Sequence, residues 1–396
     1  MSELDALQVF GETSVGWCAA TPPNESADEG GAPVLRDRGV GAADPRAPAR
    51  RVYDDPEVCA LRERLRQGNG LTGLEIVQPH EVARAARIFF RDGFVVVEGL
   101  LDPDRLARLR EASARVLRQI LEIPGVGGRK YLTESLRLPH RYSFGTASAS
   151  RHMLHDANWA ALIDLPTTTP ILTEIFGGED YWVFGAGGDL CLPGAIEYQI
   201  LHSDRRESYA LPAERIDQAR RMGLELKAGD GGDAIDHPSR QRIFERTPPV
   251  VTINFLASDL TWENGPIRQI PGTQARPDAP PSAAEEPEWM RLSILVGAPA
   301  GAGVIRDNRA WHGGTPNLSR EVRAMPNVEY GAPWLDAALF KPSMPHEVWA
   351  ELSAHAQRLS LRVKTQPGVW PEGAGAMHPL TTGRTAAKSE MRSGAE

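Results

Sequence analysis

Short apolar runs separated by glycine and proline fill the chain from about residue 180 onward, and this pattern limits the fold more than any other feature. Runs of roughly four to eight β-branched and aromatic residues between turn signals are typical of β-strands. The runs that we interpret as strands are Tyr181–Phe184, Ile196–Leu201, Val250–Ala257, Ile267–Pro271, Leu292–Val296, Gly303–Asp307 and Val322–Tyr330. A chain with this many short strands favours a β-sandwich or a jelly roll.

Two helical segments precede these strands. Glu81–Phe90 carries apolar residues at helical spacing, and the β-branched run Phe94–Val97 that follows it predicts a buried strand. Asp102 followed by Pro103 is a favourable start for the next helix, because aspartate caps free N–H groups and proline fits the first turn. We therefore predict an α+β fold with a mainly β core of jelly-roll type, braced by N-terminal helices.

The ends of the chain differ in composition from its middle. Residues 1–75 are predicted to form an irregular N-terminal arm, because Thr21–Arg51 is rich in proline, glycine and charge and has few large apolar side chains. A short helix is expected within the arm near Pro56–Arg66. The compact domain is predicted to span residues 76–365, followed by a flexible tail over residues 366–396.

A stretch of 45 residues, Arg205–Pro249, interrupts the strand pattern. It contains one amphipathic segment that we predict to be helical, Ala213–Leu226, and then a run rich in glycine and aspartate. Loops of this length inside a compact domain are usually functional, so we predict a lid-like insertion over residues 205–249. A further helix is expected near Pro345–Leu361.

Composition excludes several classes of protein. The 52 acidic residues outnumber the 44 basic ones and give a net charge of −8, which argues against general binding to nucleic acid. No apolar run reaches the roughly 20 residues of a membrane helix, and no signal peptide is visible. The three cysteines lie far apart, which argues against a disulfide framework or a thiolate zinc site. We expect a cytoplasmic protein whose partner is a small molecule; its oligomeric state stays open.

His202 and Asp204 lie two residues apart, and in an extended strand such residues face the same side. One imidazole and one carboxylate can then bind the same ion, and His312, in a glycine-rich turn, can supply a third ligand. Two histidines and one carboxylate form the facial triad of non-haem iron(II) oxygenases. Arg323 follows His312 by eleven residues, and its planar guanidinium suits pairing with the carboxylate of a 2-oxoacid. The spacing alone leaves a second interpretation open, in which these are ordinary polar residues of a strand and a turn.

The sequence around these residues resembles the phytanoyl-CoA dioxygenase family of iron(II)- and 2-oxoglutarate-dependent oxygenases. The resemblance covers roughly residues 80–335, in four blocks that follow the order of the family. They resemble its helix–strand entry, its first iron motif, its Asn-Gly-Pro … Pro-Gly-Ser strand and turn, and its distal histidine and arginine. The blocks are Ile88–Asp102, Leu201–Asp204, Ala257–Thr273 and Gly303–Arg323.

The resemblance implies a double-stranded β-helix in which iron(II) is held by the catalytic residues His202, Asp204 and His312. It implies that 2-oxoglutarate is bound by Arg323, with dioxygen as the second co-substrate. Retention of the aspartate ligand favours oxygen transfer over halogenation. Further co-substrate contacts are expected from Gln199, if a bulge turns it to the ligand face, and from Asn254.

The chain departs from the family two residues after the distal histidine. Many relatives carry a hydroxyl residue at that position, where this chain has Gly314. The corresponding contact to 2-oxoglutarate is therefore missing or comes from Thr315. The N-terminal arm and the insertion are also longer than the family core requires.

The function that we predict is hydroxylation of an unactivated C–H bond of a small molecule, with oxidative decarboxylation of 2-oxoglutarate to succinate. The high content of Arg, Ala and Gly suggests a GC-rich bacterial genome and specialised metabolism. Desaturation, epoxidation and ring formation by the same triad stay open. Two other classes are a non-catalytic jelly-roll protein that binds a metal or a small molecule, and a hydrolase that uses His202 and Asp204.

Four residues are predicted to line the substrate site. Arg205 and Arg206 directly follow the metal motif, and Arg141 and Tyr142 are further candidates for recognising a polar or anionic group. A solvated basic turn is the alternative interpretation for the two arginines that follow Asp204. A CoA thioester is disfavoured, because no concentrated basic patch is evident for its phosphates.

Overall fold

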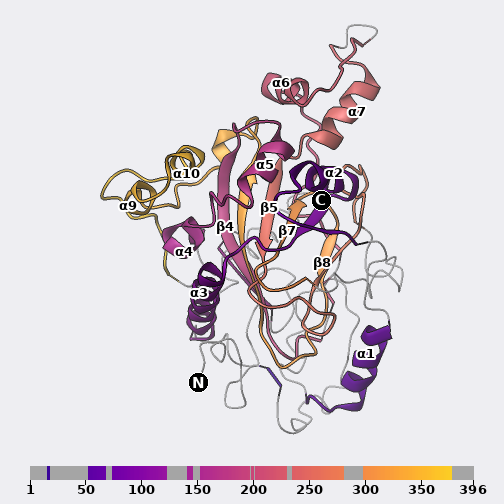
Figure 1. Cartoon of the computed structure of the whole chain (residues 1–396), viewed down its shortest axis with the longest axis vertical. Coiled ribbons are helices and arrows are strands. Elements are labelled where there is room, and N and C mark those ends of the chain that lie inside the picture. Colours follow the sequence, from indigo (N-terminus) through magenta and orange to yellow (C-terminus); the bar gives the residue numbers. More distant parts are fainter. Residues whose placement is uncertain are drawn as a thin grey trace, which may run out of the picture.

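The computed structural model describes residues 16–17, 52–67, 74–122, 141–145, 152–196, 198–199, 201–229, 234–280 and 298–376 (Figure 1). The α-helices in these ranges are α1 Pro56–Gln67, α2 Val82–Asp92, α3 Pro103–Leu121, α4 Ala157–Ala160, α5 Thr169–Phe176, α6 Ala213–Arg221, α7 His237–Arg246, α9 His346–Ala350 and α10 Ala354–Leu359. Two 3₁₀ helices are η3 Met153–His155 and η4 Ala337–Leu339. The strands are β1 Ile76–Val77, β2 Phe94–Val97, β3 Arg141–Phe144, β4 Trp182–Cys191, β5 Val250–Phe255, β6 Ile267–Gln269, β7 Gly303–Asp307, β8 His312–Gly314 and β9 Arg323–Gly331.

Seven strands form one large sheet in the order β1-β2-β7-β5-β9-β4-β3. Every neighbouring pair in it is antiparallel except β1 and β2. A small sheet of β6 and β8 is lengthened by the isolated bridges His202↔His312 and Asn264↔Asn317. A large and a small antiparallel sheet form a double-stranded β-helix, so the predicted α+β fold with a jelly-roll core is confirmed.

The two faces of the large sheet differ in polarity because side chains alternate along each strand. On β9, Val328 and Tyr330 belong to the main hydrophobic core, which also contains residues of α2, α3 and α5. Arg323, Asn327 and Glu329 stand at the alternate positions of β9 and share the opposite face. This second face is the inner one, where these polar side chains lie beside a smaller apolar cluster that includes Val304 and Met325.

Most predicted elements are present, several with the expected ends. The strands at 94–97 and 303–307 have the predicted bounds, and Asp102 caps α3 by accepting a hydrogen bond of 2.8 Å from the backbone N–H of Arg105. The short helix in the N-terminal arm is α1. Leu292–Val296 lies outside the described residues.

Three predictions of elements were wrong. The described residues of Ile196–Leu201 do not form a strand. Their backbone makes a single hydrogen bond to β8, from Gln199 to Gly314, instead of a regular ladder. The helix predicted to reach Leu226 ends at Arg221, since Gly223 takes a left-handed conformation with φ of 77°. The segment Pro345–Leu361 divides into α9 and α10, because Ser353 caps the start of a new helix.

The insertion between Asp204 and β5 forms a pair of helices, α6 and the unpredicted α7, which project at the top of Figure 1. Gln218 on α6 donates to the carbonyl oxygen of Phe176 at 2.9 Å and accepts from Trp334 Nε1 at 2.7 Å. Arg246 at the end of α7 lies 3.9 Å from the ring centroid of Phe90. Helices α6 and α7 therefore pack against α2 and α5 at one end of the barrel. None of the helices in the described ranges is both long and apolar enough to cross a membrane.

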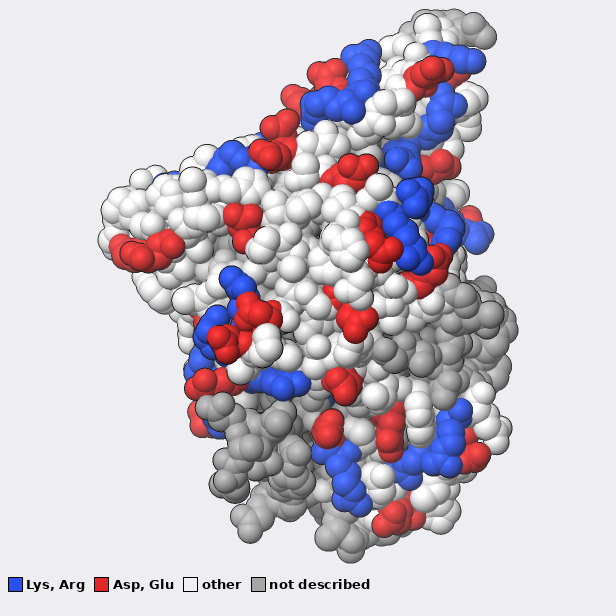
Figure 2. Space-filling view, in the orientation of Figure 1, with Lys and Arg blue, Asp and Glu red and all other residues white. Residues whose placement is uncertain are grey.

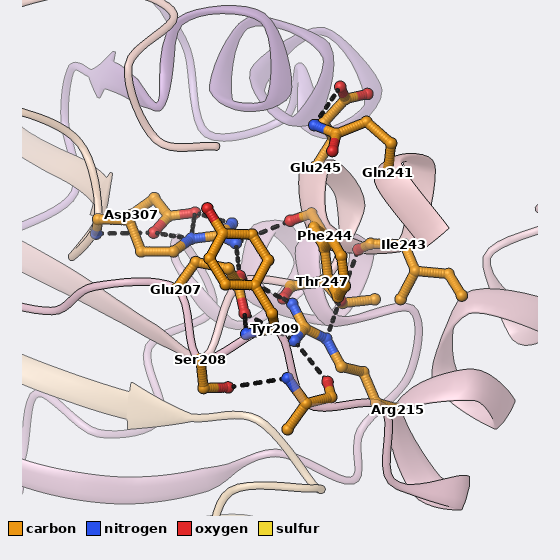
Figure 3. A network of polar contacts seen from close by, with 12 residues as sticks. Glu207, Ser208, Tyr209, Arg215, Gln241, Ile243, Phe244, Glu245, Thr247 and Asp307 are labelled. Carbon is orange, nitrogen blue, oxygen red and sulfur yellow. Dashed lines mark hydrogen bonds and ion pairs between the residues drawn. The ribbon is translucent and has the colours of Figure 1, made fainter. Parts of the chain in front are cut away.

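Four buried charges attach the insertion to the barrel (Figure 3). Glu207 pairs with Arg215 of α6 at 2.8 Å and also with Arg309 of the loop before β8. Arg309 in turn pairs with Asp307 at 2.6 Å, and each of these side chains is at most 2% exposed. Arg215 also donates to the hydroxyl of Thr247 at 2.7 Å. Glu207 lies three residues after Asp204, and Arg309 three residues before His312, so this network fixes both metal-ligand segments.

We predict that Glu207→Gln destabilises the protein by about 3 kcal/mol, because it leaves an excess of buried positive charge. Burial alone would raise the pKa of Glu207, but Arg215 and Arg309 outweigh it and lower the pKa from 4.5 to about 2. A lowered folded-state pKa stabilises the protein above pH 4.5 and loses that contribution as pH falls toward 2. The difference in free energy of unfolding between wild type and variant should therefore shrink below pH 4.5 in denaturant titrations.

The matched control is Glu245→Gln, which removes a carboxylate from the exposed side of α7. This variant should unfold like the wild type at every pH. Equal stability of the Glu207 variant and the control at neutral pH would contradict the role that we give to the network.

Candidate metal centre

The three predicted metal ligands come together beside β8. The antiparallel bridge between His202 and His312 sets the two imidazoles side by side, with ring centroids 4.3 Å apart. The carboxylate of Asp204 lies 3.7 Å from His202 Nε2 and 3.6 Å from His312 Nε2. One ligand atom from each residue lies within 4.8 Å of the other two. Two nitrogens and one oxygen are thus offered to a single ion.

The backbone holds both histidines in place. His202 and His312 exchange two backbone hydrogen bonds of 2.9 Å each. Nδ1 of His312 lies 3.0 Å from the carbonyl oxygen of Ala310, which leaves Nε2 as the nitrogen that faces Asp204. Burial, followed by the charge of Arg306, lowers the pKa of His312 well below its usual value. The imidazole is therefore neutral near pH 7, as a metal ligand must be.

Arg306 contacts the carboxylate ligand directly, which sequence reasoning missed. Its Nη2 lies 2.7 Å from Asp204 Oδ2, and its Nε donates to Asn254 Oδ1 at 3.1 Å. Burial would raise the pKa of Asp204, but the opposing influences, of which the positive charge of Arg306 is the largest, lower it further than burial raises it. The signal for Arg306 was present in the sequence, as a cation directly after the apolar pair Val304-Ile305 of β7. Asn254, which was predicted to contact the co-substrate, thus accepts a hydrogen bond from this arginine.

Arg323 begins β9 on the inner face of the sheet, opposite Cys191 of β4. Only 4% of the residue is exposed, and its Nε donates to the carbonyl oxygen of Gly265 at 3.0 Å. Burial lowers the pKa of Arg323, yet a guanidinium stays charged in proteins. Its Nη1 is buried and has no hydrogen-bond partner among the described residues. A buried cation with a spare N–H calls for an anion.

Arg141 of β3 lies against Gly314, on the same inner face as Arg323. A Cβ atom on Gly314 would come within 2.6 Å of Arg141 Nη1, while Nη2 donates to the carbonyl oxygen of Thr315. The guanidinium therefore fills the space of the missing hydroxyl side chain. The structure thus places Arg141, predicted as a substrate residue, with the residues predicted to bind 2-oxoglutarate.

Gln199 also reaches Gly314. Its backbone N–H donates to the carbonyl oxygen of Gly314 at 2.9 Å, and its side-chain Oε1 accepts from the Gly314 N–H at 3.1 Å. From Gln199 to His202 is three residues, while the paired strand spans only two, from Gly314 to His312. This extra residue is the bulge that the sequence argument required.

The remaining predicted residues are more scattered. Thr315 is fully buried and donates its hydroxyl to the carbonyl oxygen of Pro266 at 2.7 Å. Arg205 lies 4.8 Å from the ring centroid of Phe184, and Arg206 is exposed. Tyr142 points to the opposite face from Arg141 and lies in the main core. The structure thus does not bring Tyr142 or Arg206 to the other predicted site residues.

Glu329 is a second inner-face residue that sequence reasoning missed. It follows Arg323 by six residues in β9 and therefore shares its face, which strand alternation could have indicated. It pairs with Gly185 of β4 and Thr252 of β5. The position beside it on β4 therefore carries no side chain. Burial, followed by the negative charge of Asp204, raises the pKa of Glu329 to about 7.

A family model described as "Phytanoyl-CoA dioxygenase (PhyH)" matches residues 89–325. This span is more than half of the chain and contains the triad and Arg323. The chain belongs to the phytanoyl-CoA dioxygenase family. It is therefore an enzyme of the iron(II)- and 2-oxoglutarate-dependent oxygenases.

Solved structures resemble the chain at low identity. AviO1 from Streptomyces viridochromogenes is 20% identical with a TM-score of 0.39, over 65% of this chain and 97% of that one. SnoK, titled a non-heme alpha ketoglutarate dependent carbocyclase from nogalamycin biosynthesis, is 18% identical with a TM-score of 0.40, over 65% and 87%. HygX from Streptomyces hygroscopicus, solved with nickel, 2-oxoglutarate and hygromycin B, is 15% identical with a TM-score of 0.40, over 63% and 87%.

Iron(II) and 2-oxoglutarate are the cofactor and co-substrate of the phytanoyl-CoA dioxygenase family, and the residues of this chain fit both. Two imidazoles and one carboxylate are a donor set for iron(II). The buried Nη1 of Arg323 and the nearby guanidinium of Arg141 match the negative charge of 2-oxoglutarate.

We predict that His312→Ala weakens binding of Mn(II), used as a spectroscopic substitute for iron(II), by more than about a hundredfold, since it removes one of three protein ligands. Electron paramagnetic resonance of free Mn(II) during an anaerobic titration measures this affinity. His237→Ala, which changes an exposed histidine on α7, is the control and should bind like the wild type. Equal affinities in all three proteins would place the metal elsewhere.

Proposed function

We propose that the protein hydroxylates an unactivated C–H bond of a polar small molecule, coupled to conversion of 2-oxoglutarate to succinate. The observation that carries the proposal is the triad of His202, Asp204 and His312 on the inner side of the barrel, together with the spare buried N–H of Arg323. Bound iron(II) would supply the activation of dioxygen, which no protein side chain can perform. Desaturation, epoxidation and ring formation need the same residues and are alternative outcomes.

The chain's own residues would bind and orient the reactants. His202, Asp204 and His312 would hold the metal from one side and leave its other positions to the co-substrate and dioxygen. Arg323 would pair with the distal carboxylate of 2-oxoglutarate through Nη1, since its Nε is already used by Gly265. Arg141 would add a second positive charge there, in place of the hydroxyl residue of many relatives. Thr315 is a poor substitute for that hydroxyl, because its own already donates to the carbonyl oxygen of Pro266.

The substrate side of the site would be formed by Arg205 and Glu329. Arg205 directly follows the metal carboxylate, and Glu329 lies on the inner face of the sheet. A cation and an acid at this place favour a substrate with several polar groups over a simple hydrocarbon chain. On the face shown in Figure 2, the described Lys and Arg side chains alternate with Asp and Glu, without a broad basic area for the phosphates of CoA. The Arg-, Ala- and Gly-rich composition supports a place in bacterial specialised metabolism.

We predict that Arg323→Gln weakens 2-oxoglutarate binding by roughly ten- to a hundredfold, the value of a charge-assisted hydrogen bond. The measurement is an anaerobic titration that follows the weak visible charge-transfer band of the iron(II) chelate. The control is Arg220→Gln, on the exposed side of α6. Absence of the band in the wild type, with iron bound, would favour the non-catalytic jelly-roll binding protein.

We predict that Gly314→Ala weakens 2-oxoglutarate binding by about tenfold, because the new methyl group displaces Arg141 from its position 2.6 Å away. The double variant with Arg141→Ala should bind no more weakly than Arg141→Ala alone, since both changes then act through the same side chain. Additive losses in this cycle would show that Gly314 acts independently of Arg141.

A further inference from the structure

Arg306 lies on the inner face of β7 and connects two strands to the metal ligand. It pairs in the sheet with Phe94 of β2 and Thr252 of β5, so it stands in the middle of the large sheet rather than at its edge. Only 6% of the residue is exposed. A cation is costly in such a position unless its N–H groups have partners.

Two of its nitrogens have acceptors. Nη2 lies 2.7 Å from Asp204 Oδ2, and Nε donates to Asn254 Oδ1 at 3.1 Å. Asn254 is itself 1% exposed and lies in β5, one strand away. The amide thus fixes the orientation of the guanidinium, and the guanidinium fixes the carboxylate. Nη1 is buried and has no hydrogen-bond partner among the described residues.

We propose that Arg306 is a positioning residue that holds Oδ2 of Asp204 and thereby restricts this ligand to one oxygen on the metal. The inference rests on the proposed iron and 2-oxoglutarate site. A carboxylate with both oxygens free can occupy two metal positions, one of which 2-oxoglutarate requires. Arg306 also adds a positive charge beside the place where a dianion binds, and Nη1 offers it one more donor.

Arginine is needed for this task rather than lysine. The planar guanidinium reaches Asp204 and Asn254 at once with nitrogens in a fixed geometry, whereas an ammonium group is a single point charge. Arg306→Lys should therefore keep the charge but lose the fixed orientation, and restore binding only in part.

The proposal predicts opposite effects on the two ligands. In Arg306→Gln, Asp204 is released and loses a neighbouring positive charge, and both changes favour a metal cation. Affinity for Mn(II) should stay within about threefold of the wild type or rise. Affinity for 2-oxoglutarate should fall by roughly ten- to a hundredfold, because a charge-assisted contact and an open position are lost together.

The test measures both affinities anaerobically: Mn(II) by electron paramagnetic resonance, and 2-oxoglutarate by the charge-transfer band of the iron(II) protein. The proteins are wild type, Arg306→Gln, Arg306→Lys, Arg306→Ala and Asn254→Ala. Guanidinium chloride at low millimolar concentration should partly restore 2-oxoglutarate binding to Arg306→Ala. Urea, of the same shape but without charge, should not.

Each outcome is decisive. A wild type that binds neither ligand overturns the proposed function itself. A wild type that binds both, with an unchanged 2-oxoglutarate affinity in Arg306→Gln, overturns the role of Arg306 and leaves the function intact. Parallel loss of both affinities, without rescue by guanidinium, shows a merely structural role and also overturns the inference. If the Arg306 variants do not fold, Asn254→Ala replaces them as the test, because it removes the partner of Arg306 and changes no charge. An unchanged 2-oxoglutarate affinity in this variant overturns the inference.

Discussion

Two backbone hydrogen bonds between His202 and His312 bring together segments that are 110 residues apart in sequence, and the candidate site depends on this contact. The bridge sets both imidazoles side by side and places Asp204, two residues on, against them. The same pairing brings Gln199 to Gly314, and through Gly314 to Arg141. The metal ligands and two of the residues proposed for the co-substrate, Gln199 and Arg141, are therefore positioned by one short stretch of antiparallel backbone.

The inner face of the barrel carries an unusual amount of buried charge. Arg141, Arg306 and Arg323 are each at most 6% exposed and lie on strands of the large sheet. Placing three cations on one inner face is unfavourable unless anions are present to offset them. Asp204 supplies one negative charge, and 2-oxoglutarate would supply two more, which would offset the two positive charges of bound iron(II). Binding of the metal together with its co-substrate would therefore leave the net charge of this face unchanged.

The insertion has a different relation to the site than its length suggested. Its helices are held by Glu207, Arg215 and Arg309, all of which are nearly inaccessible to solvent. A swinging lid would have to expose or separate these charges on each opening, which is costly. The network instead connects the segment after Asp204 with the segment before His312. We therefore regard residues 205–249 as a brace for the ligand segments, and the lid remains a prediction that the network disfavours.

The sequence by itself determined the elements and the identity of the principal residues. Short runs of β-branched and other apolar residues indicated β2 and β7, and the Asp-Pro pair indicated the start of α3. The order of the family blocks pointed to His202, Asp204, His312 and Arg323. These features are local, or depend on spacing along the chain, so they can be read without coordinates.

Only the tertiary structure decided which side chains meet. The pairing of β7 with β5 put Arg306 against Asn254, and the hydrogen bond from Arg205 N–H to the carbonyl oxygen of Asn308 brought Asp204 to the same arginine. The approach of β3 to β8 put Arg141 against Gly314, and no spacing in the sequence indicates any of these contacts. Tyr142 and Arg141 are neighbours in sequence, yet one lies in the core and the other on the inner face, because successive residues of a strand point to opposite sides. Strand order and facing are set by the packing of the whole barrel, and a motif carries no record of them.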